Sequence, residues 1–222
     1  MTNPEPVIPP AHRLTNHWYS RAGWHPGRLF DTWHLVFDDA PLLHDLATRC
    51  KNSLADLPGL NYVPNEWLHM TVQGVGWTDE LSSQDRNAVI HRAAAELKEL
   101  GARDITVGPP IVKGEALVLA GTPVRFLVDI RDRLRVAVQQ ALGRAPWEAA
   151  EQAKGFMPHV SIAYAQNDAD AAPYAAALGK VSPASVRVPI RHVALIRQER
   201  QLDPNWRYVW QELARVPLKV VQ

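Results

Sequence analysis

Two short stretches of the chain repeat one pattern: a histidine, an apolar residue, a hydroxyl-bearing residue and a second apolar residue. The first covers residues 69–72 (His-Met-Thr-Val), and the second covers residues 159–162 (His-Val-Ser-Ile). Imidazole exchanges protons near neutral pH, and hydroxyl groups hydrogen-bond anionic oxygens. Two such couples facing each other are suited to displacement at phosphorus, with one imidazole as the base on the attacking oxygen and the other as the acid on the leaving oxygen.

Both stretches lie in runs that alternate as half-buried strands do. In a strand, side chains i and i+2 share a face, so His69 and Thr71 point the same way, followed by Gln73. His159 and Ser161 share a face for the same reason. A strand that gives imidazole and hydroxyl to successive positions of one face gives up apolar burial twice, which is typical of a site.

The sequence thus predicts a set of site residues. His69 and His159 are the predicted acid–base pair, and the symmetry of the pattern leaves open which of them is the base. The hydroxyls would bind non-bridging oxygens as charge builds on them. Strand parity adds two further substrate-binding candidates, and the full predicted substrate-binding set is Thr71, Ser161, Gln73 and His34. This arrangement calls for no metal and no cofactor.

These residues also have other interpretations. A single histidine on a strand is usually structural, and a buried hydroxyl often bonds only to backbone. Two copies of the pattern favour catalysis or phosphate binding instead. Nine histidines would also suit a zinc site, but the sequence contains neither His-Glu-x-x-His nor Cys-x-x-Cys. It contains no Gly-x-x-x-x-Gly-Lys loop, which argues against a P-loop nucleotide hydrolase.

The pair of tetrapeptides resembles the two signatures of the two-histidine phosphoesterase superfamily, which includes 2′-5′ RNA ligases and cyclic phosphodiesterases. The resemblance runs from about residue 28 to residue 217. It implies a metal-independent enzyme that opens 2′,3′-cyclic phosphates of RNA ends or cyclic nucleotides, with 2′-5′ RNA ligation as the permitted reverse reaction. The alternative is a non-catalytic RNA- or nucleotide-binding module that kept the cleft.

The chain departs from this family pattern at two positions. Many members follow the first signature with an aromatic residue and the second with an arginine, where this chain has Gly74 and Tyr164. Substrate stacking and phosphate neutralisation must then come from elsewhere. Three cations are candidates to compensate: Lys113, Arg125 and Arg197.

Length and composition set outer limits. The chain has 222 residues, 46% of them hydrophobic, and a formal net charge of +1, which argues against an extended nucleic-acid groove. A single cysteine excludes an intrachain disulfide and a thiolate metal cluster. The start of the sequence shows no signal-peptide pattern, and no run of about 20 apolar residues is present. We expect a cytoplasmic monomer that makes no membrane contact.

Periodicity predicts the order of the elements. Strands are expected at 28–37, 66–75, 104–108, 115–120, around the second motif, and at 186–198 and 206–216. Helices are expected after residue 38, at 79–100 and at 168–178, and the segment 124–142 is predicted to start as a strand and become a helix near residue 129. Residues 145–155 are predicted to form a loop or short helical turn.

Each half of this order contains one motif, which is a loose internal duplication. With the resemblance, it implies an α+β fold of two similar lobes, whose antiparallel-rich sheets face a central cleft across a pseudo-two-fold axis. Four prolines among the first ten residues predict an extended, poorly ordered arm over residues 1–13. The aromatic residues that follow predict a segment packed across the body. We divide the chain into an arm (1–27) and a bilobal domain (28–222).

Overall fold

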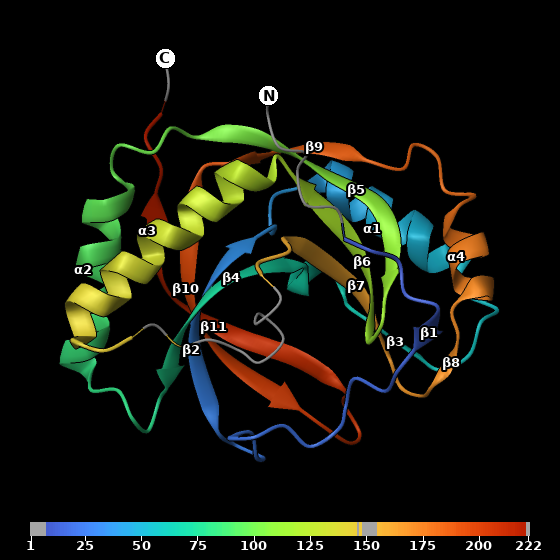
Figure 1. Cartoon of the computed structure of the whole chain (residues 1–222), viewed down its shortest axis with the longest axis horizontal. Helices are drawn as coiled ribbons and strands as arrows, with labels where there is room; N and C mark the ends of the chain where they lie inside the picture. The colour runs from blue at the N-terminus through green and yellow to red at the C-terminus, as the bar shows by residue number, and fades with distance from the viewer. Residues whose placement is uncertain (1–7, 146, 148–154, 221–222) are drawn as a thin grey trace.

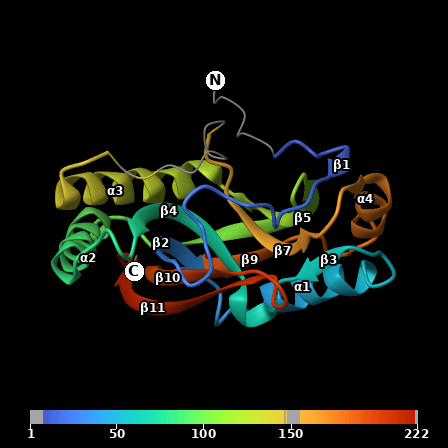
Figure 2. The same cartoon turned by 90° about the horizontal axis from the view of Figure 1, so that it is seen from below.

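The computed structural model of the protein describes residues 8–145, 147 and 155–220. It has the predicted α+β architecture, with two large antiparallel sheets, a small two-stranded one and two pairs of helices (Figure 1). One helix pair lies at each end of the molecule in both views (Figures 1 and 2). In the part of the chain described, no helix is both long and apolar enough to cross a bilayer.

The first sheet has four strands in the order β11-β10-β2-β4, and every neighbouring pair is antiparallel. Its strands are β2 (Leu29–Val36), β4 (His69–Trp77), β10 (His192–Gln201) and β11 (Arg207–Pro217). Helices α2 (Ser83–Leu97) and α3 (Val124–Leu142) pack against this sheet and against each other. The first motif therefore lies on an edge strand, β4.

The second sheet has five strands in the order β3-β7-β6-β5-β9. Its strands are β3 (Leu60–Tyr62), β5 (Arg103–Lys113), β6 (Ala116–Thr122), β7 (His159–Ala165) and β9 (Val186–Ile190). Helices α1 (Pro41–Ser53) and α4 (Ala172–Leu178) lie against it. The second motif lies on β7, and β7 approaches β4 across the gap between the sheets. Each lobe thus contributes one motif strand.

Helix α3 corrects the sequence prediction for its first turn. The segment from Val124 to about Asp129 is helical rather than a strand, and the helix begins directly after Pro123. The apolar residues that suggested alternation belong to one helical stripe that packs inward, with buried residues Val124, Phe126, Leu127, Ile130, Leu134 and Val138. The predicted end is confirmed: Gly143 has a left-handed φ of 63° and caps the helix.

The single strand predicted over 186–198 is wrong, because this run divides between the two sheets. β9 pairs with β5 in the second sheet, whereas β10 pairs with β2 and β11 in the first. Pro189 lies in β9, an edge strand, where a missing amide hydrogen is tolerated. The chain passes from one sheet to the other at Arg191. The strands predicted at 104–108 and 115–120 pair as the hairpin β5–β6, and β10 pairs with β11 in a second hairpin.

The N-terminal segment is ordered from Ile8 onward, so the poorly ordered arm predicted for 1–13 is wrong over residues 8–13. The side chain of Ile8 is buried, and the amide of Ala11 donates to the carbonyl of Val112. Strand β1 (Arg13–Leu14) pairs with β8 (Ala169–Asp170). Residues 1–7 and most of 145–155 lie outside the described residues, and the boundary at residue 28 stays a prediction.

A substitution at Asp31 tests how the first sheet is attached to helix α2. Its carboxylate is fully buried and accepts from Arg86 on α2 and from Arg197 on β10. We expect Asp31→Ala to lower the free energy of unfolding by about 3–5 kcal/mol, because two guanidinium groups lose their buried partner. Asp79→Ala, which removes an exposed partner of Arg28, is the matched control and should cost far less. Equal losses in urea unfolding would contradict this account.

Candidate active site

The two motif histidines are held in the same way. In each, the ring Nδ1 lies within hydrogen-bonding distance of the carbonyl oxygen two residues earlier: 2.8 Å from His69 to Trp67, and 2.7 Å from His159 to Met157. A carbonyl oxygen only accepts, so Nδ1 must carry the proton. The neutral ring then has its lone pair on Nε2, which is the atom that can take up or return a proton.

A one-residue bulge follows the hydroxyl in both motif strands. On β4, His34 pairs with Thr71 and Trp33 pairs with Gln73, so Val72 is extra. On β7, Val118 pairs with Ser161 and Leu117 pairs with Ala163, so Ile162 is extra. An extra residue reverses the alternation of side chains beyond it. The next side chain on the face of the histidine and the hydroxyl therefore comes three residues after the hydroxyl, and not two.

This register puts Gly74 and Tyr164 on the same faces as their motifs. Gly74 pairs with Thr32, and Tyr164 pairs with Ala116. These are the two positions at which the sequence departs from the family pattern. A Cβ on Gly74 would lie 2.8 Å from the ring of Trp147 and 3.0 Å from that of Phe30, so neighbouring aromatic rings fill the space of a side chain there.

The bulge also corrects the prediction for Gln73. Strand parity placed this residue beside His69 and Thr71, but its ladder partner is Trp33, whose side chain lies on the other face of the sheet. The Gln73 amide nitrogen donates to the carbonyl oxygens of Gly74 and Trp147, at 3.0 and 2.6 Å. Gln73 thus holds the backbone of Trp147 at the edge of β4.

The first motif has a third histidine behind it. The ring of His34 stacks on that of His69, with centroids 4.4 Å apart and planes 9° from parallel. Its Nε2 lies 3.2 Å from Oγ1 of Thr71, and its side chain is fully buried. The edge of Trp210 closes the stack. His34 thus lies beside the first motif, as strand parity predicted, but its ring lies behind the side chains of His69 and Thr71.

The second motif has a different neighbourhood. The ring of Tyr164 stacks on that of His17, with ring centroids 4.2 Å apart. The N-terminal segment therefore packs against this half, as the sequence predicted for its aromatic residues. His17 in turn bonds the hydroxyl of Tyr208 at 2.9 Å and the carboxylate of Glu115 at 3.2 Å. This network ties β7, β11 and the N-terminal segment together.

Burial controls the charge of the histidines. Loss of solvation lowers the pKa of His69 and that of His159 to about 4, against their Nδ1 hydrogen bonds, which raise it. The positive charges of Lys113 and His69 lower the pKa of His159 further, so the two motif rings lie within electrostatic range of each other. Burial, and then the charge of His69, holds the pKa of His34 well below its ordinary value.

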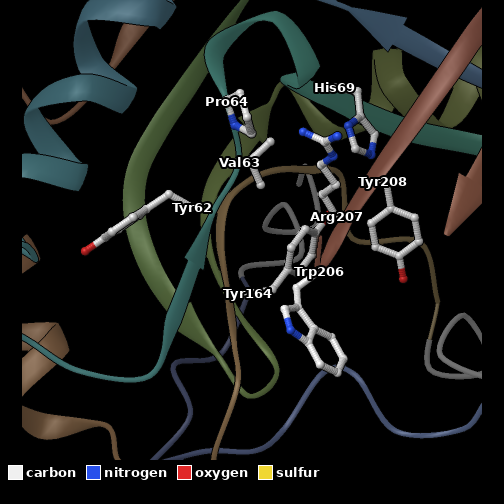
Figure 3. Close-up of a pocket in the computed structure, with 8 residues that line it drawn as sticks. All are labelled: Tyr62, Val63, Pro64, His69, Tyr164, Trp206, Arg207 and Tyr208. Atoms are coloured by element: carbon white, nitrogen blue, oxygen red, sulfur yellow. The ribbon is translucent and has the colours of Figure 1, made fainter. Parts of the chain in front are cut away.

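A small pocket opens beside His69 (Figure 3). It is walled by residues 62–64, which begin at the last residue of β3, by Tyr164 of the second motif strand, and by residues 206–208 at the tip of the β10–β11 hairpin. Trp206 has a left-handed φ of 45°, which turns the chain at this tip. Tyr62 directs its ring away from the other side chains of the pocket (Figure 3). The pocket thus has one motif histidine, aromatic rings and the cation Arg207.

Sequence reasoning missed the hairpin residues of this wall. They lie on a segment predicted only as a strand, and no motif distinguishes them. Of the three cations proposed to compensate for the departures, Arg197 is paired with the buried Asp31, and Arg125 is exposed on α3. Only Lys113 is coupled to a motif histidine. Within the described ranges, no three histidine, cysteine or acidic side chains are grouped so as to hold a metal ion.

A sequence profile of the 2′-5′ RNA ligase superfamily matches residues 39–202. Both motif strands fall within the matched part, so the chain belongs to this superfamily of two-histidine phosphoesterases. No curated protein sequence matches the chain.

Solved structures share this fold over nearly their whole length. TT0787 of Thermus thermophilus is 21% identical with a TM-score of 0.59, covering 86% of this chain and 97% of that one. E. coli LigT complexed with phosphate is 16% identical with a TM-score of 0.55, covering 89% and 99%. LigT complexed with 3′-AMP is 17% identical with a TM-score of 0.53, covering 87% and 98%. At these identities the likeness shows the fold alone.

The tautomers of the motif histidines can be observed directly. At pH 7 we expect His69 and His159 to be neutral, with the proton on Nδ1, and to titrate near pH 4 because their burial opposes charge. Long-range ¹H–¹⁵N correlation spectra across a pH series report both properties. A proton on Nε2 of either motif ring would contradict the geometry described.

Proposed function

We propose that this protein is a metal-independent phosphodiesterase that hydrolyses 2′,3′-cyclic phosphates at RNA ends or in cyclic nucleotides. The observation that carries the proposal is the duplicated arrangement of His69 and His159: each ring is fixed by the same backbone hydrogen bond and leaves Nε2 for proton transfer. The two strands come from facing sheets and approach each other. An in-line displacement needs its base and its acid on opposite sides of one phosphorus atom.

The chemistry follows from one neutral and one protonated ring. The neutral Nε2 removes a proton from water, and the water oxygen bonds to phosphorus. The bond from phosphorus to the ribose 3′-oxygen breaks, and the second imidazolium gives its proton to that oxygen. The product is a 2′-phosphate with a free 3′-hydroxyl, and the two rings have exchanged protonation states. With the 5′-hydroxyl of an RNA in place of water, the same ring opening would give a 2′-5′ linkage.

The two hydroxyls are assigned to the phosphoryl oxygens. Thr71 is exposed and Ser161 lies beside the second histidine, each two residues after its imidazole. Hydrogen bonds to oxygens that gain charge stabilise the transition state more than the ground state. We assign His34 to positioning, because its fully buried ring reaches Thr71 and not the cleft surface. Gln73 is left out of the substrate contacts because it faces the helices.

Single substitutions test the acid–base roles. We expect His69→Ala and His159→Ala each to lower kcat on a 2′,3′-cyclic nucleotide by about 10²–10⁴-fold, the usual worth of positioned acid–base catalysis. The double variant should fall little further, because both rings act in one step. His91→Ala, an exposed histidine on α2, is the matched control and should keep full activity.

These assays are run in excess EDTA, with circular dichroism to confirm folding. Undiminished turnover in either single variant would falsify the assignment. Loss of activity on chelation, with recovery on adding a divalent cation, would overturn metal independence. Binding of nucleotide without turnover by the wild-type protein would identify the chain as a binding module instead.

The low pKa values predict how activity depends on pH. Because the pKa of each ring is about 4, the singly protonated form of the pair that the mechanism needs becomes more populated as pH falls from 8 toward 5. We expect kcat/KM to rise over that range, by up to about tenfold per pH unit. Binding of sulfate, which does not titrate there, should take up a proton, because an anion between the rings favours imidazolium.

Calorimetry in two buffers of different ionisation enthalpy measures that proton uptake. The His69→Ala and His159→Ala proteins should take up less than the wild type. A kcat/KM that is flat or falls on acidification, while the protein stays folded, would contradict the acid–base assignment.

A further inference from the structure

The motif residues bring no fixed positive charge to the cleft. His69 and His159 are mainly neutral at pH 7, because burial lowers the pKa of each to about 4, and both hydroxyls are neutral. A phosphodiester carries one negative charge, and further charge builds on its oxygens as a fifth oxygen approaches phosphorus. A cation in reach of the motifs would therefore act on both binding and rate.

The register of the second sheet places Lys113 on the motif face. On adjacent antiparallel strands, residues directly opposite each other share a face. Lys113 at the end of β5 pairs with Ala116 of β6, and Ala116 pairs with Tyr164 of β7. Tyr164 shares its face with Ser161 and His159 because of the bulge between them. Lys113 therefore lies in the row of side chains next to the second motif.

The charge of the Lys113 ammonium is not neutralised by an ion pair with a described residue. Lys113 is half-buried, and among the described residues no hydrogen bond or ion pair to its ammonium is formed. The acid that acts on its charge is Glu115, whose carboxylate is engaged by Arg21 and His17. Burial lowers the pKa of Lys113, and Glu115 opposes this. The charge of Lys113 reaches His159, where it lowers the imidazole pKa.

We propose that Lys113 is the cation that binds the substrate's phosphate beside the second motif. The identity of the ligand rests on the proposed function, but the anion site itself does not. An anion held there would contact the ammonium on one side and the Ser161 hydroxyl and His159 ring on the other. Arg207, in the pocket beside His69, is the competing cation.

Lys113→Met removes the charge and keeps most of the stem. We expect the Kd for inorganic phosphate and the KM for a 2′,3′-cyclic nucleotide both to rise by about 10–100-fold, with a fall in kcat, as for a lost charge-assisted hydrogen bond. Lys113→Arg should recover most of the affinity. Lys180→Met, which removes an exposed lysine after α4, is the matched control and should change neither constant. Thermal unfolding checks that every variant is folded.

A third readout separates a charge effect from a packing effect. The pKa of His159, followed by NMR, should rise in Lys113→Met and stay low in Lys113→Arg, while that of His69 changes less. Phosphate affinity unaltered in Lys113→Met, or lowered instead by Arg207→Met, would overturn the inference. If the wild type binds phosphate through Lys113 yet turns nothing over, the proposed function fails and the anion site stands. If turnover needs both histidines but not Lys113, the proposed function stands and the anion site at Lys113 fails.

Discussion

The site depends on a hydrogen bond made twice, from the Nδ1–H of a motif histidine to a carbonyl oxygen just before its strand. This bond fixes both the tautomer and the direction of each ring, which a solvent-exposed histidine would leave free. It also makes the backbone ahead of each strand part of the machinery. The 3₁₀ turn η1 (Asn65–Trp67) sets the carbonyl for His69, and the Met157-Pro158 segment sets the one for His159.

The second shared device is the bulge that follows each hydroxyl. An uninterrupted strand would bring Gln73 and Ala163 to the cleft, whereas the extra residue brings Gly74 and Tyr164. The two halves then diverge. On β4 the space is filled by rings from elsewhere in the chain, and on β7 a tyrosine is locked beneath His17. A duplicated backbone thus supports two chemically unequal sides.

Much of the fold is predictable because hydrophobic periodicity and turn residues report local structure. The motif pair is also predictable, since its spacing repeats. Events that depend on partners distant in sequence are not. The alternation of apolar and polar residues does not reveal a bulge, so counting every second residue places Gln73 on the wrong face of β4. The crossing at Arg191 lies in an apolar run that serves two sheets. The first turn of α3 resembles a strand because Val124 and Phe126 fit either period.

The N-terminal segment has a consequence for how the molecule is made. His17 is synthesised early, but its partners Tyr164 and Tyr208 leave the ribosome late, and Arg200 binds its carbonyl oxygen from the same late region. Strand β2 likewise waits for β10. The first sheet cannot be completed until the C-terminal hairpin exists, and such long-range pairing slows folding. A nascent chain that stops before β10 and β11 would therefore lack both a finished first sheet and the hairpin wall of the pocket beside His69, so binding competence waits for this hairpin.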